Sequence, residues 1–67
     1  MIAVEKLVII RAVSPADWSR EYTIGMRGTL LAYERSERDW YYKAKVNICG
    51  STYTFAHVQL EEVHEAI

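Results

Sequence analysis

The sequence lacks the features that are typical of several common classes of protein. It has 67 residues with one cysteine and one proline, and its eight Lys and Arg nearly balance nine Asp and Glu. The lone Cys49 cannot form an internal disulfide, whereas small secreted domains usually carry several. No apolar stretch approaches the roughly 20 residues of a membrane-spanning helix. We therefore expect a cytoplasmic protein that is neither secreted nor membrane-spanning.

Length and composition favour a single small domain over residues 1–67. With 51% hydrophobic and 25% charged residues, the chain is too apolar and too nearly neutral for a disordered protein. A chain of this size buries only about 60% of the surface that it exposes when unfolded. That leaves little room for both a core and a deep catalytic cavity, so we expect no enzymatic activity.

The distribution of apolar residues predicts strands. Val and Ile dominate residues 4–13, which end where Ser14-Pro15 cannot continue a central strand. Further strands are expected over residues 29–35, 40–49, 52–56 and 61–63, with turns at 36–39, 50–51 and 57–60. Residues 14–25 form a long first loop, in which Ser14 and Pro15 can start a helical turn through Arg20. The alternative for the end of the chain is an amphipathic helix over residues 56–67.

Alternation within these segments predicts which side chains form the core. Every second residue from Trp40 through Tyr42 to Ile48 falls on one strand face. The predicted core comprises Leu7, Ile9, Leu30, Val46, Phe55, Leu60 and Val63. Five short strands without a long helix indicate an all-β fold, a small five-stranded antiparallel barrel.

The order of these segments resembles an SH3-like barrel. Within that superfold it is most similar to the group containing the ferredoxin-docking accessory subunit of photosystem I and the variable chain of ferredoxin-thioredoxin reductase. The resemblance rests on the segments LVIIR, Gly28-Thr29-Leu30, YKAKVNI and TFAHVQLEEV, in that order. It implies a barrel with a short turn before its last strand, without a cofactor, that serves as a docking platform for a protein partner. Because this superfold serves unrelated functions, the site itself has to indicate the function.

The two Trp, five Tyr and one Phe are more aromatic residues than so small a core can hold. If Tyr42, Tyr53 and Phe55 fill the core, three others are left on the first loop and an outer face, namely Trp18, Tyr22 and Tyr41. Rigid aromatics in such places are typical binding anchors. The structural alternative is that Trp18 and Trp40 fold back and close the two ends of the barrel.

A local excess of basic residues lies in the middle of the chain. Tyr41, Lys43 and Lys45 share an outer strand face, and Arg35 and Arg38 lie at the adjoining hairpin. Such a face can orient an acidic protein partner or bind a nucleic acid. It is also typical of a solvated strand whose lysines discourage edge pairing.

The residues that could support catalysis or metal binding are few and irregularly spaced. Cys49, His57 and His64 form no pair with metal-ligand spacing, and Ser51 lacks the glycines of a nucleophile elbow. The sequence therefore predicts no catalytic residue, no metal site and no cofactor.

Together these features predict a non-catalytic protein-binding module that docks a larger cytoplasmic protein or enzyme through the first loop and the face of the second and third strands. The expected partner-binding residues are Trp18, Tyr22, Arg35, Arg38, Tyr41, Lys43 and Lys45. One alternative is a small nucleic-acid-binding barrel that uses the same basic face. Another is a homo-oligomer, because exposed strand edges invite self-pairing. No membrane partner is expected.

Overall fold

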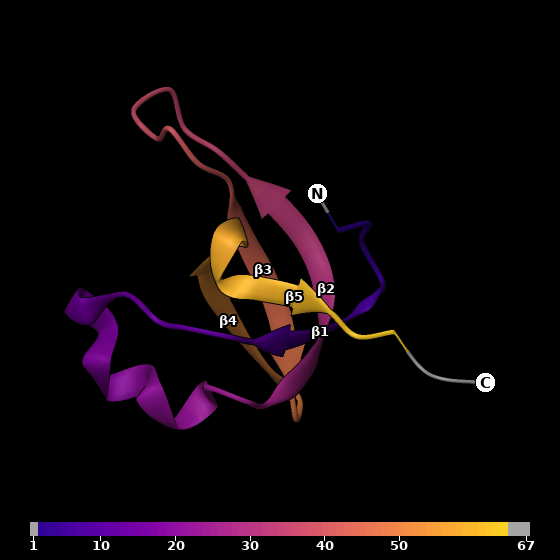
Figure 1. Ribbon diagram of the computed structural model, residues 1–67. Coiled ribbons are helices and arrows are strands. Elements are labelled where there is room, and N and C mark those ends of the chain that lie inside the picture. Colours follow the sequence, from indigo (N-terminus) through magenta and orange to yellow (C-terminus); the bar gives the residue numbers. More distant parts are fainter. Residues whose placement is uncertain (1, 65–67) are drawn as a thin grey trace.

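The computed structural model describes residues 2–64, which form five strands and two 3-10 helices (Figure 1). In chain order these are β1 (Leu7–Ile10), η1 (Pro15–Thr23), β2 (Arg27–Glu34), β3 (Lys43–Ile48), β4 (Ser51–Ala56), η2 (His57–Gln59) and β5 (Leu60–Glu62). The strands form one antiparallel sheet in the order β4-β3-β2-β1-β5. This confirms the predicted all-β fold with five antiparallel strands, a long first connection and a short turn before the last strand. Neither of the two helices within residues 2–64 has the length and apolar character needed to cross a membrane.

The sheet bends around its own core. β2 curves along its length in Figure 1, and its pairing with β3 changes register between Leu30 and Ala32. Such an irregularity increases the local bend and twist of a strand. All five strands contribute to one buried cluster, which consists of Val8, Ile10, Leu30, Ala44, Val46, Ile48, Phe55 and Leu60.

The prediction of the core residues of β1 is wrong by one position. Val8 and Ile10 are fully buried, whereas Leu7 and Ile9 are half-buried. This segment is apolar at every position, so alternation could not decide which face turns inward. β1 pairs with β2 on one side and with β5 on the other, and this pairing places Val8 and Ile10 against the core. The strand is also shorter than the predicted range of residues 4–13.

β3 confirms the predicted alternation only within the strand itself. Ala44, Val46 and Ile48 are buried, as expected. The strand begins later than predicted, and the residues before it depart from the pattern: Trp40 is 82% exposed and Tyr42 is half-buried. Residues that precede the hydrogen-bonded strand need not alternate between the two faces of the sheet, so the alternation does not predict their burial.

A two-residue turn at Cys49-Gly50 joins β3 to β4, one residue earlier than the predicted Gly50-Ser51. Both turn residues have positive φ, 52° at Cys49 and 86° at Gly50. That is the requirement of a type I′ turn, whose twist matches that of the flanking strands. The side-chain oxygen of Asn47 accepts a hydrogen bond from the Gly50 N–H at 3.0 Å and ties the turn to β3.

The end of the chain forms a turn and a strand, so the alternative helix over residues 56–67 is wrong for the part that is described. η2 is a single turn, and β5 pairs with β1. The closing strand begins at Leu60, one residue earlier than predicted. Val63, an expected core residue, lies just past β5 and is half-buried. Residues 65–67 of the alternative helix lie outside the described residues.

Candidate functional site

The first loop is largely helical. η1 extends from Pro15 to Thr23, beyond the predicted turn through Arg20. The predicted N-cap is confirmed, because the Ser14 hydroxyl accepts a hydrogen bond from the Ala16 N–H at 3.3 Å. The backbone departs from helical geometry at Asp17, with φ −111° and ψ 33°, and this separates two turns.

Side chains of η1 form hydrogen bonds within η1 and to the edge strand β4. Thr23 is fully buried, and its hydroxyl donates to the Arg20 carbonyl at 2.6 Å. The Arg20 guanidinium donates to the Thr54 carbonyl of β4 at 3.0 Å. The Tyr22 hydroxyl donates to the Tyr53 hydroxyl at 3.3 Å, and this hydrogen bond raises the pKa of Tyr22 because it stabilises the protonated form.

Trp18 and Tyr22 of η1 and Trp40 before β3 are exposed to solvent. Trp18 is 72% exposed, Tyr22 is 63% exposed and Trp40 is more exposed than either. The alternative in which Trp18 and Trp40 close the ends of the barrel is therefore wrong, and the buried core consists of aliphatic side chains and Phe55. Tyr41 is half-buried, and its ring packs edge-on against that of Trp40 with 5.1 Å between the centroids.

An open groove of about 440 Å³ lies between η1, the segment before β3, the end of β4 and η2. Two of the predicted site residues, Tyr41 and Lys43, line it. Arg20, Thr54 and Gln59 also line it, and sequence reasoning missed all three. Arg20 could have been suspected from its position between Trp18 and Tyr22. Thr54 and Gln59 carry no comparable signal, because the path of the chain through β4 and η2 brings them here.

The basic strand face is matched by carboxylates. The Lys45 ammonium lies 2.8 Å from the Glu34 carboxylate across the β2–β3 pair. The Lys43 ammonium lies 3.7 Å from the carboxylate of Asp39. All four side chains are at least partly accessible to solvent, so these pairs contribute little to stability. They do reduce the positive potential of the face.

The two predicted arginines lie outside the groove. Arg35 places its guanidinium 5.1 Å from the centroid of the Tyr42 ring, an arrangement typical of a cation–π interaction. Arg38 is exposed in the loop between β2 and β3. Trp18, Tyr22 and Lys45 do not line the groove either, so the structure brings together only Tyr41 and Lys43 of the predicted set.

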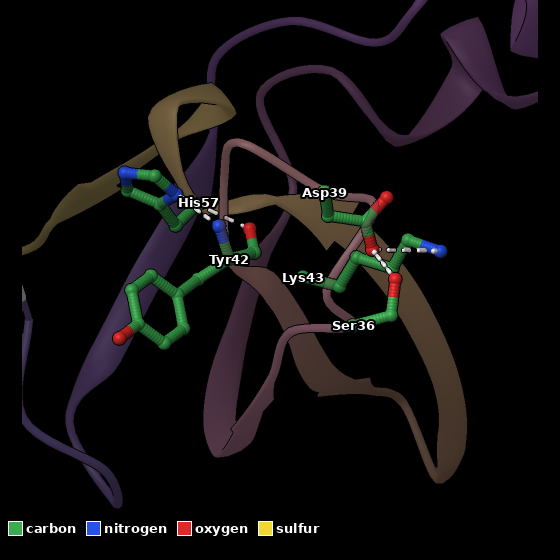
Figure 2. Close-up of polar contacts among 5 residues, drawn as sticks. All are labelled: Ser36, Asp39, Tyr42, Lys43 and His57. Carbon is green, nitrogen blue, oxygen red and sulfur yellow. Dashed lines mark hydrogen bonds and ion pairs between the residues drawn. The ribbon is translucent and has the colours of Figure 1, made fainter.

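The loop between β2 and β3 has an internal polar contact. The Ser36 hydroxyl donates to the Asp39 carboxylate at 3.0 Å, and Lys43 approaches the same carboxylate (Figure 2). The hydrogen bond from Ser36 lowers the pKa of Asp39, and the charge of Lys43 acts in the same direction. These residues border a second, smaller hollow of about 250 Å³.

His57 joins η2 to the start of β3, although the sequence suggested only an ordinary polar residue. Its Nδ1 lies 3.1 Å from both the backbone nitrogen and the carbonyl oxygen of Tyr42 (Figure 2). The backbone N–H of His57 also donates to that carbonyl at 2.9 Å. This contact holds the chain in place where it leaves the groove-lining Tyr41 and enters the sheet.

No group of three or more His, Cys, Asp or Glu side chains within residues 2–64 is arranged to hold a metal ion. No family model, curated protein or solved structure matches this chain. The resemblance to SH3-like docking subunits therefore stays a prediction, and the function has to be inferred from the groove and its surroundings.

Proposed function

We propose that this chain is a non-catalytic protein-binding module that docks an extended segment of a larger cytoplasmic protein. The observation that carries this proposal is the groove of about 440 Å³, an open surface lined by residues from four separate segments of the chain. Small-molecule sites are usually enclosed and mostly apolar. An open groove along a sheet edge suits an extended polypeptide better.

Exposed aromatic residues in two of the segments that border the groove support a protein partner, although these side chains do not line the groove themselves. Trp18 and Tyr22 belong to η1, and Trp40 packs on the groove-lining Tyr41. Large, rigid aromatic side chains that lose water on binding supply much of the affinity of protein interfaces. The packing of the core does not explain why Trp18 and Trp40 are exposed.

The charges of the groove favour a partner segment with an acidic side chain. Arg20 and Lys43 line the groove, and Asp17 is the one carboxylate among its lining residues. Arg20 uses one N–H group to hold Thr54, and a guanidinium has five. The remaining donors are available to a carboxylate. Such charge complementarity mainly sets the orientation and rate of encounter.

The charges give less support to the alternative function, nucleic-acid binding. Each lysine of the strand face has a carboxylate beside it, Glu34 for Lys45 and Asp39 for Lys43. Nucleic-acid affinity depends on cations that replace the counterions of phosphates. Lysines matched by carboxylates release few counterions, whereas docking of one acidic side chain needs only a single cation such as Arg20 in the groove.

Selection from a randomised peptide display library tests the proposal. We expect wild-type protein to enrich peptides that share at least one acidic position. A selected peptide, titrated into isotope-labelled protein, should shift the NMR signals of residues in the groove, such as Ala16, Tyr41 and Thr54. The absence of enrichment, or shifts confined to other surfaces, would contradict the proposal.

Two charge reversals provide a matched comparison. Lys43→Glu should weaken binding of the selected peptide by about tenfold or more, because it reverses a charge within the groove. Lys6→Glu makes the same change at an exposed residue that does not line the groove, and it should leave binding unchanged. If single-stranded oligonucleotides of unrelated sequence bind instead, with affinity that falls steeply with salt, the nucleic-acid alternative is correct.

A further inference from the structure

The two edges of the sheet differ in how they are protected from pairing with other chains. β5, at one edge, has only three residues, and two of them are Glu61 and Glu62. Short length and charge both discourage strand addition. β4, at the other edge, has six residues, STYTFA, without a charged side chain. Its threonines and aromatics favour β structure.

The β3–β4 hairpin determines which backbone groups of β4 point away from the sheet. In a two-residue hairpin the pair flanking the turn is hydrogen-bonded, and such pairs alternate along the strands. Thr52, Thr54 and Ala56 therefore direct their N–H and C=O groups outward. Arg20 donates to the Thr54 carbonyl at 3.0 Å, as this pattern requires. Gln59 likewise accepts from the N–H of Ala56 at 3.0 Å.

Only the first half of this outer edge is free. The second half is already used within the chain by Arg20 and Gln59. Thr52 is exposed, and no hydrogen bond from elsewhere in residues 2–64 reaches its backbone N–H or C=O. The free hydrogen-bonding positions of β4 are therefore centred on Thr52.

We propose that a second copy of this chain adds to this free half, antiparallel and symmetric about Thr52. The N–H of each Thr52 donates to the C=O of the other copy, so both outward groups are satisfied. This register places Ser51 opposite Tyr53, and the paired stretch stops before Thr54, whose carbonyl Arg20 already uses. No charged side chain lies in the paired stretch, and the two sheets join into one.

The length of the free edge favours a second copy over a longer peptide strand. A peptide along the whole of β4 would displace Arg20 from Thr54 and Gln59 from Ala56. Pairing about Thr52 leaves these contacts in place, because it uses only the free half of each copy. Self-pairing of β5 would bring glutamates of two copies together and is unfavourable. The inference does not rest on the proposed docking function.

Sedimentation equilibrium from micromolar to millimolar protein concentration tests the pairing. We expect wild-type protein to form a reversible dimer within this range. Thr52→Pro removes the outward N–H without touching the bonds between β4 and β3, and should weaken the dimer by about tenfold or more. Glu62→Pro removes the corresponding N–H at the β5 edge and should leave dimerisation unchanged.

Circular dichroism first establishes that each variant is folded. If Thr52→Pro does not fold, Thr52→Lys replaces it, because two lysines at the symmetric position repel each other across the strands. The inference is wrong if the wild-type chain stays monomeric at millimolar concentration. It is equally wrong if a folded Thr52 variant dimerises as the wild type does, or if the β5 variant is impaired to the same extent.

The lone cysteine measures the register directly. Cys49 is exposed and lies three residues before Thr52, so the two copies of Cys49 are offset by six residues in the proposed pairing. At about 3.4 Å per residue their Cα atoms lie roughly 20 Å apart along the strands. Pulsed electron paramagnetic resonance on nitroxide-labelled Cys49 should give a distance of that order. A dimer with a clearly longer distance would refute pairing through β4.

Discussion

Replacing Gly28 by alanine tests how closely β2 approaches β3 in the core. A Cβ atom at this position would lie 2.6 Å from the carbonyl oxygen of Asn47 and 2.6 Å from Cγ1 of Val46. It would also lie 2.8 Å from Cγ1 of Ile48. Ordinary carbon contacts are about 3.5–4.0 Å, so all three are severe overlaps. Gly28 is buried in the middle of the sheet, so the added methyl group cannot turn away into solvent.

The contact with the carbonyl oxygen sets the magnitude. The two Cγ1 atoms can move by side-chain rotation, but the Asn47 carbonyl belongs to the backbone of β3, so β2 and β3 must separate. Overpacking of a core typically costs about 1–3 kcal/mol, and a backbone obstacle places Gly28→Ala at the upper end of that range. In a domain of this size about 1 kcal/mol lowers Tm by roughly 4–8 °C, so we expect a decrease of about 10–20 °C.

Urea and thermal unfolding followed by circular dichroism provide the measurement, with Gly25→Ala as the control. Gly25 has φ +88° and nothing within 4 Å of an added Cβ, so its cost is backbone strain alone, about 1–2 kcal/mol. Gly28→Ala combined with Val46→Ala should be less destabilising than the sum of the single changes, because one overlap disappears. A loss of stability at Gly28 no larger than that at Gly25 would show that β2 and β3 accommodate the added methyl group without separating.

The burial of Ile10 and the hydrogen bonds of Ser36 and Tyr33 each have a measurable effect on stability or titration. Ile10→Ala should cost about 2–5 kcal/mol in urea unfolding and Ile9→Ala roughly half as much, because only Ile10 is fully buried; a larger loss at Ile9 than at Ile10 would restore the sequence-based assignment. Ser36→Ala should raise the pKa of Asp39 toward its ordinary value in an NMR titration. Because the folded-state pKa lies below the unfolded one, the wild-type advantage is complete above about pH 4 and is lost as pH falls through the folded pKa; an advantage that persists in acid would contradict this. Tyr33→Phe removes the hydrogen bond from its hydroxyl to the Ile2 carbonyl and should cost about 1 kcal/mol, and an unchanged urea midpoint would show that the bond contributes nothing.

Several strands and turns followed from local chemistry. Alternation located the buried face of β3, and Ser14-Pro15 located the start of η1, because in both cases a few neighbouring residues suffice. The same method assigned the wrong face of β1 to the core, because its apolar residues occupy both faces. It also placed Trp40 in a strand that begins only at Lys43.

The candidate site was only partly predictable. Exposure of Trp18 and Tyr22 was foreseen, because a small core cannot hold every aromatic residue. The groove was not, because Arg20, Thr54 and Gln59 come from η1, β4 and η2 and meet only after the chain folds. Neither were the carboxylates beside Lys43 and Lys45 recognised as their partners, which changes the character of the basic face.

The class of fold, the number of strands and their order along the chain can be predicted from the sequence, because strand periodicity and turn residues are local properties. Tertiary structure decided which face of β1 is buried, how η1 lies against β4, and which edge positions are left without a partner. These features depend on contacts between segments that are distant in the sequence. The bend of β2 and single contacts such as that of Arg20 with Thr54 select one arrangement, whereas the local sequence pattern allows several equally.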